Sequence, residues 1–188
     1  NDLACVDNSA HLLKYDSIYG ILEHSITSDV NHLIVNKNPI RYFRKKDPAQ
    51  LPWAELDIDV VLECTGFFSD RALAEKHLHA GARRVLISQP APNPDNTIVF
   101  GVNHKTLQSS DLIISNASCT TNCLAPLAQV IHQNFEVSAG LINTVHSDTK
   151  DQRLLDGDHD DLMRARSAGL SLIPVSYTHL RAHETASD

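Results

Sequence analysis

The chain has 188 residues, of which 42% are hydrophobic and 21% charged, an ordinary composition for a globular protein with room for one domain and part of another. Its formal net charge of −7 argues against nucleic acid or an anionic membrane as the main partner, because both attract clustered Lys and Arg. One basic stretch, residues 41–46, departs from this balance, and a solvated surface segment is its favoured interpretation. The absence of an apolar run of 18 residues or more also predicts no membrane partner.

The cysteines and histidines predict no metal centre. The four cysteines form no CxxC pair, which argues against a disulfide framework and a structural zinc site. The 11 histidines are scattered and form no HExxH-type pair. We therefore expect a cytoplasmic protein with reduced thiols.

The first elements predicted along the chain are a short helix and a hairpin. The helix covers residues 8–14. The hairpin strands, residues 32–35 and 39–43, flank Asn36-Lys37-Asn38, a tripeptide that favours a turn.

From residue 59 onward, apolar strands alternate with helices. A strand over residues 59–64 ends at Thr65-Gly66, and a helix capped by Ser69-Asp70 runs to His79 and stops at Gly81. The later elements predicted are strands over residues 85–88, 98–102 and 112–115, a helix over 124–132 and a strand over 139–145. This alternation indicates an α/β fold with a parallel sheet covered on both faces.

The segment that contains Cys119 follows a buried strand and leads directly into a helix. Ser118 is a good N-cap, so Cys119 is expected in the first helical turn. There the helix dipole favours the thiolate, and free backbone N–H groups can hold an oxyanion. Cys119 is therefore a candidate nucleophile, although local physics leaves open that it is a small buried apolar residue. Cys123, one turn further on, is interpreted as structural.

His146 is the best candidate for the base that such a nucleophile needs. It ends a predicted strand, where catalytic side chains of α/β folds often project, although an isolated His is more often structural. The following hydroxyls and Arg164 suit a phosphate, which arginine binds through two parallel hydrogen bonds. A solvated loop is the alternative for this segment.

Ser-Asn-Ala-Ser-Cys-Thr-Thr-Asn at residues 115–122 resembles the active-site signature of the glyceraldehyde-3-phosphate dehydrogenase family. Flanking motifs agree with the pattern of this family in order and spacing over residues 1 to about 174. They include Asn1-Asp2-Leu3, Cys64-Thr65-Gly66, Gly81-Ala82-Arg83 and Gly101-Val102-Asn103-His104. The resemblance implies a partial Rossmann dinucleotide-binding domain over residues 1–118, with its N-terminal part missing. It also implies the truncated start of an α+β catalytic domain over residues 119–175.

The resemblance implies an NAD-dependent phosphorylating aldehyde dehydrogenase. The enzyme would oxidise glyceraldehyde 3-phosphate to 1,3-bisphosphoglycerate, in glycolysis or gluconeogenesis, through a thioester on Cys119 that inorganic phosphate cleaves. His146 would activate the thiol, and the full-length protein would be a homotetramer. The positions implied for ligands are Asp2, Thr65 and Gly66 for the cofactor, Ser118 and Thr120 for the attacking phosphate, and Thr149, Asp151 and Arg164 for the substrate phosphate. The carboxylate of Asp2 favours NAD over NADP, because it would repel a 2′-phosphate.

The sequence departs from the family pattern at both ends. The glycine-rich strand–turn–helix that cradles the pyrophosphate does not precede Asn1. After Pro174 the family's Ser-Thr-Gly-Ala-Ala run is replaced, and residues 176–188 resemble a translated sequencing adaptor. We therefore expect the 188-residue chain to be inactive by itself.

Two alternative functions stay open. Erythrose-4-phosphate dehydrogenase shares the nucleophile signature, but Thr149 keeps a hydroxyl that this enzyme usually lacks. A non-catalytic nucleotide-binding or interaction module is the second alternative. The presence of both Cys119 and His146 argues against it, because such a module needs neither.

Overall fold

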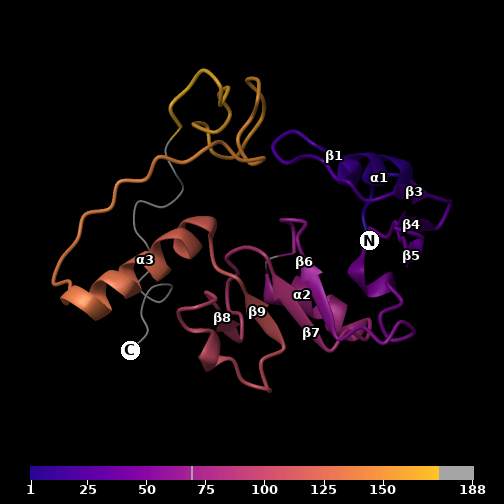
Figure 1. Ribbon diagram of the computed structural model, residues 1–188, viewed down its shortest axis with the longest axis horizontal. Helices are drawn as coiled ribbons and strands as arrows, with labels where there is room; N and C mark the ends of the chain where they lie inside the picture. Colours follow the sequence, from indigo (N-terminus) through magenta and orange to yellow (C-terminus); the bar gives the residue numbers. More distant parts are fainter. Residues whose placement is uncertain (69, 174–188) are drawn as a thin grey trace. The chain divides into compact units, whose positions relative to one another are not determined.

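The structure, a computed structural model, describes residues 1–68 and 70–173. The chain divides into two compact units (Figure 1). Unit 1 consists of residues 1–98 and 106–117, and unit 2 consists of residues 99–105 and the chain from residue 118 onward. Within the described residues, no helix has both the length and the apolar character needed to cross a bilayer.

Unit 1 begins with the predicted helix, α1 (Val6–Lys14). It packs against two antiparallel strands, β3 (Ile26–Ser28) and β4 (His32–Val35), and buries Val6 and Ala10. Between α1 and β3 along the chain, a small hairpin is formed by β1 (Tyr15–Asp16) and β2 (Gly20–Ile21).

The predicted hairpin is confirmed as β4 paired with β5 (Asn38–Arg41). Asn36 and Lys37 both have positive φ, 50° and 69°, as a tight two-residue hairpin turn requires. The second strand ends at Arg41, two residues earlier than predicted. The backbone carbonyl of Phe43 accepts a hydrogen bond from the amide of Asp2 (3.0 Å) instead, so the chain after β5 supports the N-terminal segment. A short 3-10 helix, η1 (Pro48–Gln50), follows.

The predicted parallel sheet is confirmed, with strand order β6-β7-β9-β8. Its strands are β6 (Val60–Glu63), β7 (Arg84–Ile87), β8 (Asn96–Thr97) and β9 (Ile113–Ser115). Helix α2 (Arg71–His79) packs against β7 and β9 (Figure 1). The fully buried core that joins them consists of Ala74, Val85, Ile87 and Ile113. Each large apolar side chain in it contributes roughly 1.5–3 kcal/mol through burial.

The ends of α2 follow the predicted signals. The side chain of Asp70 caps the first turn by accepting from the amide of Ala72, whereas Ser69 lies outside the described residues. At the other end Gly81 has a φ of 107°, and the amide of Ala82 donates to the carbonyl of His77 (3.1 Å). This is the Schellman arrangement, in which glycine takes the left-handed position after the helix.

Two predictions about this sheet are wrong. Residues 98–102 form no strand, because the side chain of Asn103 accepts the amide of Val99 (2.7 Å) and closes a turn there. Within unit 1, the described residues also do not cover both faces of the sheet. Along β6 the residues alternate between exposed and buried, with Val60 and Leu62 exposed on one face. Apolar composition was therefore a poor guide to which face is buried.

Unit 2 is built around the long helix α3 (Cys119–Phe135), which extends the predicted helix in both directions. Another short 3-10 helix, η2 (His104–Thr106), lies where the two units alternate along the chain. The strand predicted over residues 139–145 is not formed, and Leu141 and Val145 are 99% and 95% exposed. A strand needs a neighbouring strand to take up its backbone hydrogen bonds, and the described part of unit 2 contains no other strand. Residues 176–188, interpreted as an adaptor-like tail, lie outside the described residues.

Candidate active site

The start of α3 carries Cys119 in the predicted first helical turn. Ser118 is the N-cap, and its hydroxyl accepts from the amide of Thr121 (2.9 Å). The preceding residue, Ala117, is buried and has a φ of 57°, an uncommon value for a residue with a Cβ. Such local strain is often found at functional sites. The buried cap and the tight turn before it fix where the Cys119 backbone begins its helix.

Cys119 and His146 come together in unit 2. The Cys119 Sγ lies 3.2 Å from the His146 Nε2, across 27 residues of chain. The His146 Nδ1 lies 2.6 Å from the backbone carbonyl of Ser147, which can only accept. Nδ1 is therefore the nitrogen that carries the proton in neutral His146, and Nε2 has a lone pair that faces the sulfur. This is the arrangement that a histidine needs in order to take a proton from a thiol.

The electrostatics favour transfer of that proton. The hydrogen bond with His146 is the main cause that lowers the pKa of Cys119, and the backbone amide and hydroxyl of Thr120 lower it further, whereas burial acts in the opposite direction. The pKa of His146 is raised, chiefly by the Ser147 carbonyl and then by Cys119. The two shifts point the same way, toward a thiolate beside an imidazolium. Since both side chains are exposed, solvent screens part of this effect.

The two residues predicted to hold the attacking phosphate flank the nucleophile. The Ser118 hydroxyl is buried and engaged with Thr121, so its main contact in this structure is the helix cap. The Thr120 hydroxyl is also buried, and it helps to lower the pKa of the neighbouring Cys119 thiol. The phosphate-binding roles of both residues stay predictions.

The residues predicted to surround the substrate phosphate form a local cluster. Arg164 is ion-paired with Asp151 and, at 3.4 Å, with Asp161. The amide and hydroxyl of Thr149 both donate to the side chain of Gln152. A carboxylate repels phosphate, so Asp151 is suited to orienting the guanidinium of Arg164 rather than to contacting a phosphate itself. The hydrogen bonds and the ion pair described here for Thr149 and Asp151 are made within residues 149–164. Cys119 forms its contact with His146 instead.

The three predicted cofactor residues all belong to unit 1 and are exposed. Asp2 accepts the amide of Ala4 through Oδ1 (3.0 Å), which leaves Oδ2 without a hydrogen bond to a described residue. Thr65 and Gly66 form the turn that follows the carboxyl end of β6, and Gly66 has a φ of 82°. Ligands of open α/β sheets bind beyond the carboxyl ends of the strands, so the position of this turn suits a dinucleotide.

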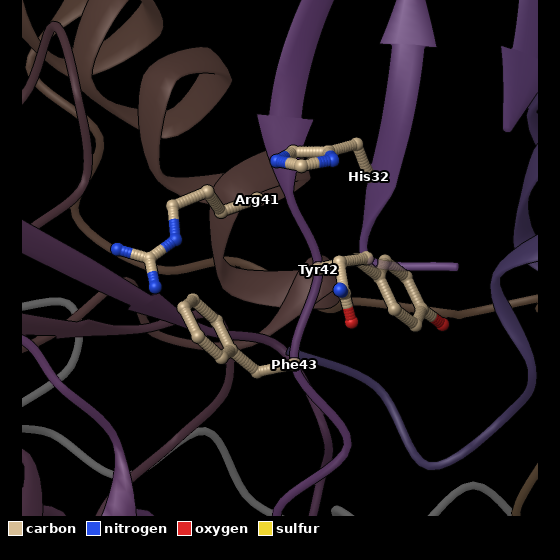
Figure 2. Close-up of a pocket in the computed structure, with 5 residues that line it drawn as sticks. His32, Arg41, Tyr42 and Phe43 are labelled. Carbon is tan, nitrogen blue, oxygen red and sulfur yellow. The ribbon is translucent and has the colours of Figure 1, made fainter. Parts of the chain in front are cut away.

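A pocket of about 420 Å³ also lies in unit 1, beside the β4–β5 hairpin (Figure 2). Figure 2 shows the imidazole of His32, the guanidinium of Arg41 and the ring of Phe43 around it. The guanidinium lies 5.2 Å from the centre of the Phe43 ring. Within the basic stretch, Arg44 donates to the Leu3 carbonyl at 3.2 and 3.0 Å. The stretch thus packs partly against the N-terminal segment and is not only a solvated surface.

Two features of these sites were missed in the sequence. The Ser147 carbonyl that sets the tautomer of His146 is a backbone group, and no residue pattern reveals its direction. The second is Glu63, an acidic residue that is only 4% exposed at the end of β6. A carboxylate inside an otherwise apolar strand was a visible signal, because buried carboxylates are rare unless they are paired.

Comparisons with known proteins identify the family of the chain. Residues 1–71 match the model for the NAD binding domain of glyceraldehyde 3-phosphate dehydrogenase, and residues 118–186 match the model for its C-terminal domain. Relatives named glyceraldehyde-3-phosphate dehydrogenase are 48% identical in Cereibacter sphaeroides, 50% in Geobacillus stearothermophilus and 48% in Zymomonas mobilis. The alignments cover 94%, 94% and 97% of this chain and 52%, 53% and 54% of the relatives. The chain thus spans about half the length of the curated relatives it matches. It belongs to the glyceraldehyde-3-phosphate dehydrogenase family.

Proposed function

We propose that the protein that contains this chain is an NAD-dependent phosphorylating aldehyde dehydrogenase that converts glyceraldehyde 3-phosphate to 1,3-bisphosphoglycerate. The observation that carries the proposal is the 3.2 Å contact between the Cys119 Sγ and the His146 Nε2 at the start of α3. A nucleophile, a base and a helix N-terminus lie together there, as acyl transfer through a thioester requires.

The proposed reaction begins when the thiol proton of Cys119 passes to His146. The thiolate attacks the aldehyde carbon, and the resulting tetrahedral oxygen accepts a hydrogen bond from the protonated Nε2. NAD, when bound, supplies the acceptor for the hydride that leaves this carbon. The thiohemiacetal thereby becomes a thioester on Cys119. Inorganic phosphate then attacks the thioester carbon, the acyl phosphate departs, and the thiolate is restored.

The residues of unit 1 fit the cofactor. The Asp2 Oδ2, which forms no hydrogen bond to a described residue, is suited to accept hydrogen bonds from the two hydroxyls of a ribose, and the carboxylate would repel a 2′-phosphate. Thr65 and Gly66 would lie along the dinucleotide where the β6 carboxyl end meets solvent. We assign NAD rather than NADP on these grounds.

The phosphate groups are assigned to unit 2. Thr120, with Ser118 at the helix cap, would hold the attacking phosphate near the sulfur. Thr149 and Arg164 would bind the substrate phosphate, and Asp151 would orient the guanidinium. We further propose a homotetramer in the cytoplasm, with the Rossmann domain over residues 1–118 and the catalytic domain beginning at Cys119.

The test is NADH formation by the full-length protein. We expect it to require glyceraldehyde 3-phosphate, NAD and inorganic phosphate together, to be abolished by Cys119→Ser, and to persist in the matched control Cys123→Ser, which changes the thiol one turn further along α3. NADH production that persists in Cys119→Ser, or that needs no phosphate, would contradict the proposal.

A further inference from the structure

A chain of buried polar side chains in unit 1 connects Trp53 to the turn at Thr65. Glu63 and His77 are each only 4% exposed, and the Glu63 Oε2 lies 3.1 Å from the His77 Nε2. The other nitrogen of the ring, Nδ1, lies 3.0 Å from the Trp53 Nε1. Glu63 ends β6, and His77 lies on α2.

The tryptophan determines which nitrogen of His77 carries the proton. An indole N–H can only donate, so the His77 Nδ1 must accept. Neutral His77 therefore carries its proton on Nε2 and donates it to Glu63. Trp53 is itself held in place, because the next amide, that of Ala54, donates to the Ala80 carbonyl (3.0 Å) at the end of α2.

The second oxygen of Glu63 faces the predicted cofactor turn. Its Oε1 accepts from the amide of Thr65 (2.8 Å) and from the hydroxyl of the same residue. Burial alone would raise the pKa of Glu63, but the hydrogen bonds from His77 and Thr65 outweigh it, and the pKa lies below its ordinary value. One buried carboxylate thus accepts from both hydrogen-bond donors of Thr65, while the residue itself is exposed.

The same cluster reaches the other predicted cofactor segment. The ring of Phe43 stands edge-on to Trp53, with centroids 6.3 Å apart, and the Phe43 carbonyl accepts the amide of Asp2. Asp2 and Thr65, which are far apart in the sequence, are therefore each anchored to the residues around Trp53. A buried carboxylate that only stabilised the fold would have no need of this connection.

We propose that Glu63 is a positioning residue that, through its hydrogen bonds to Thr65, sets the shape of the Thr65-Gly66 turn for the cofactor. His77 holds the carboxylate of Glu63 in place, and Trp53 fixes the tautomer of His77. The inference rests on the proposed function insofar as it assigns this turn to NAD, but the hold of Glu63 on Thr65 can be measured without any cofactor.

Glu63→Gln in the full-length protein is the decisive variant, because it keeps the shape of the side chain. A glutamine has one oxygen and one NH₂ group, so it cannot accept from both His77 and the Thr65 amide. As long as Trp53 fixes the tautomer of His77, either the His77 Nε2–H or the Thr65 amide must face the new NH₂ group, and that donor loses its acceptor. Trp53→Phe removes that restriction, because His77 can then carry its proton on Nδ1 and accept from Gln at position 63 through Nε2.

Two measurements are made on Glu63→Gln, Trp53→Phe, the double variant and the control Glu55→Gln, which neutralises an exposed carboxylate. They are amide hydrogen exchange at Thr65 without cofactor and the Kd for NAD, with kcat at saturating NAD alongside. We expect Glu63→Gln to speed the exchange and to raise the Kd about tenfold or more, the typical effect of losing a hydrogen bond to a charged group, with kcat within about twofold. Adding Trp53→Phe should recover part of the affinity. Glu55→Gln should change neither quantity.

The outcomes separate the inference from the proposed function. A lower melting temperature in Glu63→Gln with unchanged exchange at Thr65 would overturn the inference and leave Glu63 as a residue of the fold alone. Faster exchange with an unchanged Kd for NAD would overturn it as well. If the wild-type protein bound no NAD, the proposed function would fail, and the exchange at Thr65 would still decide whether Glu63 holds the turn.

Discussion

Replacing His146 by asparagine in the full-length protein should slow the reaction of Cys119 with an alkylating reagent at neutral pH. Asparagine offers no basic nitrogen at the position of Nε2 and carries no charge. The pKa of Cys119, which His146 lowers, should rise toward its ordinary value, so less thiolate is present at neutral pH. The curve of labelling rate against pH should therefore move to higher pH in the variant.

The magnitude follows from the geometry. Unit charges separated by the observed 3.2 Å attract by about 1.3 kcal/mol when water screens them, as it does between two exposed side chains. This corresponds to about a tenfold change in the fraction of thiolate below the pKa of the thiol. A more basic thiolate is also a better nucleophile, with a Brønsted coefficient of about 0.4–0.5. The net loss of rate at neutral pH should thus be about threefold to fourfold.

The assay is alkylation with iodoacetamide, followed by mass spectrometry of the cysteine-containing peptides over a range of pH. Cys5 and Cys64 are exposed thiols of unit 1 and serve as internal controls, whose rates should not differ between variant and wild type. The reasoning would be refuted if Cys119 reacted equally fast in both proteins. It would also be refuted if wild-type Cys119 reacted no faster than the two controls.

Four further variants test the surrounding residues. Ser118→Ala should destabilise the protein by about 1 kcal/mol through loss of the α3 cap, measured by urea unfolding, and an equal loss in Ser110→Ala, an exposed position, would contradict this. Gly66→Ala should lower the free energy of unfolding by about 1–2 kcal/mol in the same experiment, because the φ of 82° disfavours a residue with a Cβ. Steric overlap is not the reason, since the nearest atom would be 3.7 Å from the Cβ. An unchanged free energy of unfolding would contradict this prediction. Asp2→Asn should raise the ratio of NADP to NAD affinity roughly tenfold in calorimetry, and an unchanged ratio would remove Asp2 from cofactor selection. Arg164→Lys should raise the KM for glyceraldehyde 3-phosphate by roughly tenfold at similar kcat, whereas an unchanged KM would place the substrate phosphate elsewhere.

The parts of the fold that could be predicted are those whose signals are local. Asn36 and Lys37 favour the turn that forms between β4 and β5. Asp70 and Gly81 mark the two ends of α2, because a side-chain cap and a left-handed glycine each act within one helical turn. Ser118 was recognised as the cap of α3 for the same reason.

The wrong predictions concern properties that depend on distant partners. Residues 139–145 have the composition of a strand, but a strand forms only beside another one. The face of β6 that carries Val60 and Leu62 is exposed, because burial depends on which elements pack there and not on composition. The strand predicted over residues 98–102 is not formed, because the side chain of Asn103 closes a turn there, and β8 ends before it, at Thr97.

The candidate site shows the same division. Cys119 could be named as a candidate nucleophile from its helix start, and His146 as the best candidate base among 11 histidines. Their contact of 3.2 Å and the tautomer set by Ser147 depend on how 27 residues of chain return to α3. Glu63 was not identified, because its importance lies in two partners, Thr65 and His77, that only the folded chain brings together.

The central claim is that Cys119 forms a thioester with the substrate. The most direct measurement is mass spectrometry of the full-length protein after acid quenching of a reaction with glyceraldehyde 3-phosphate and NAD but no inorganic phosphate. Without phosphate the acyl group has no acceptor other than water, so it should accumulate on the peptide that contains Cys119 and disappear when phosphate is added. Absence of the acyl group from that peptide, or its presence on Cys123 instead, would contradict the account.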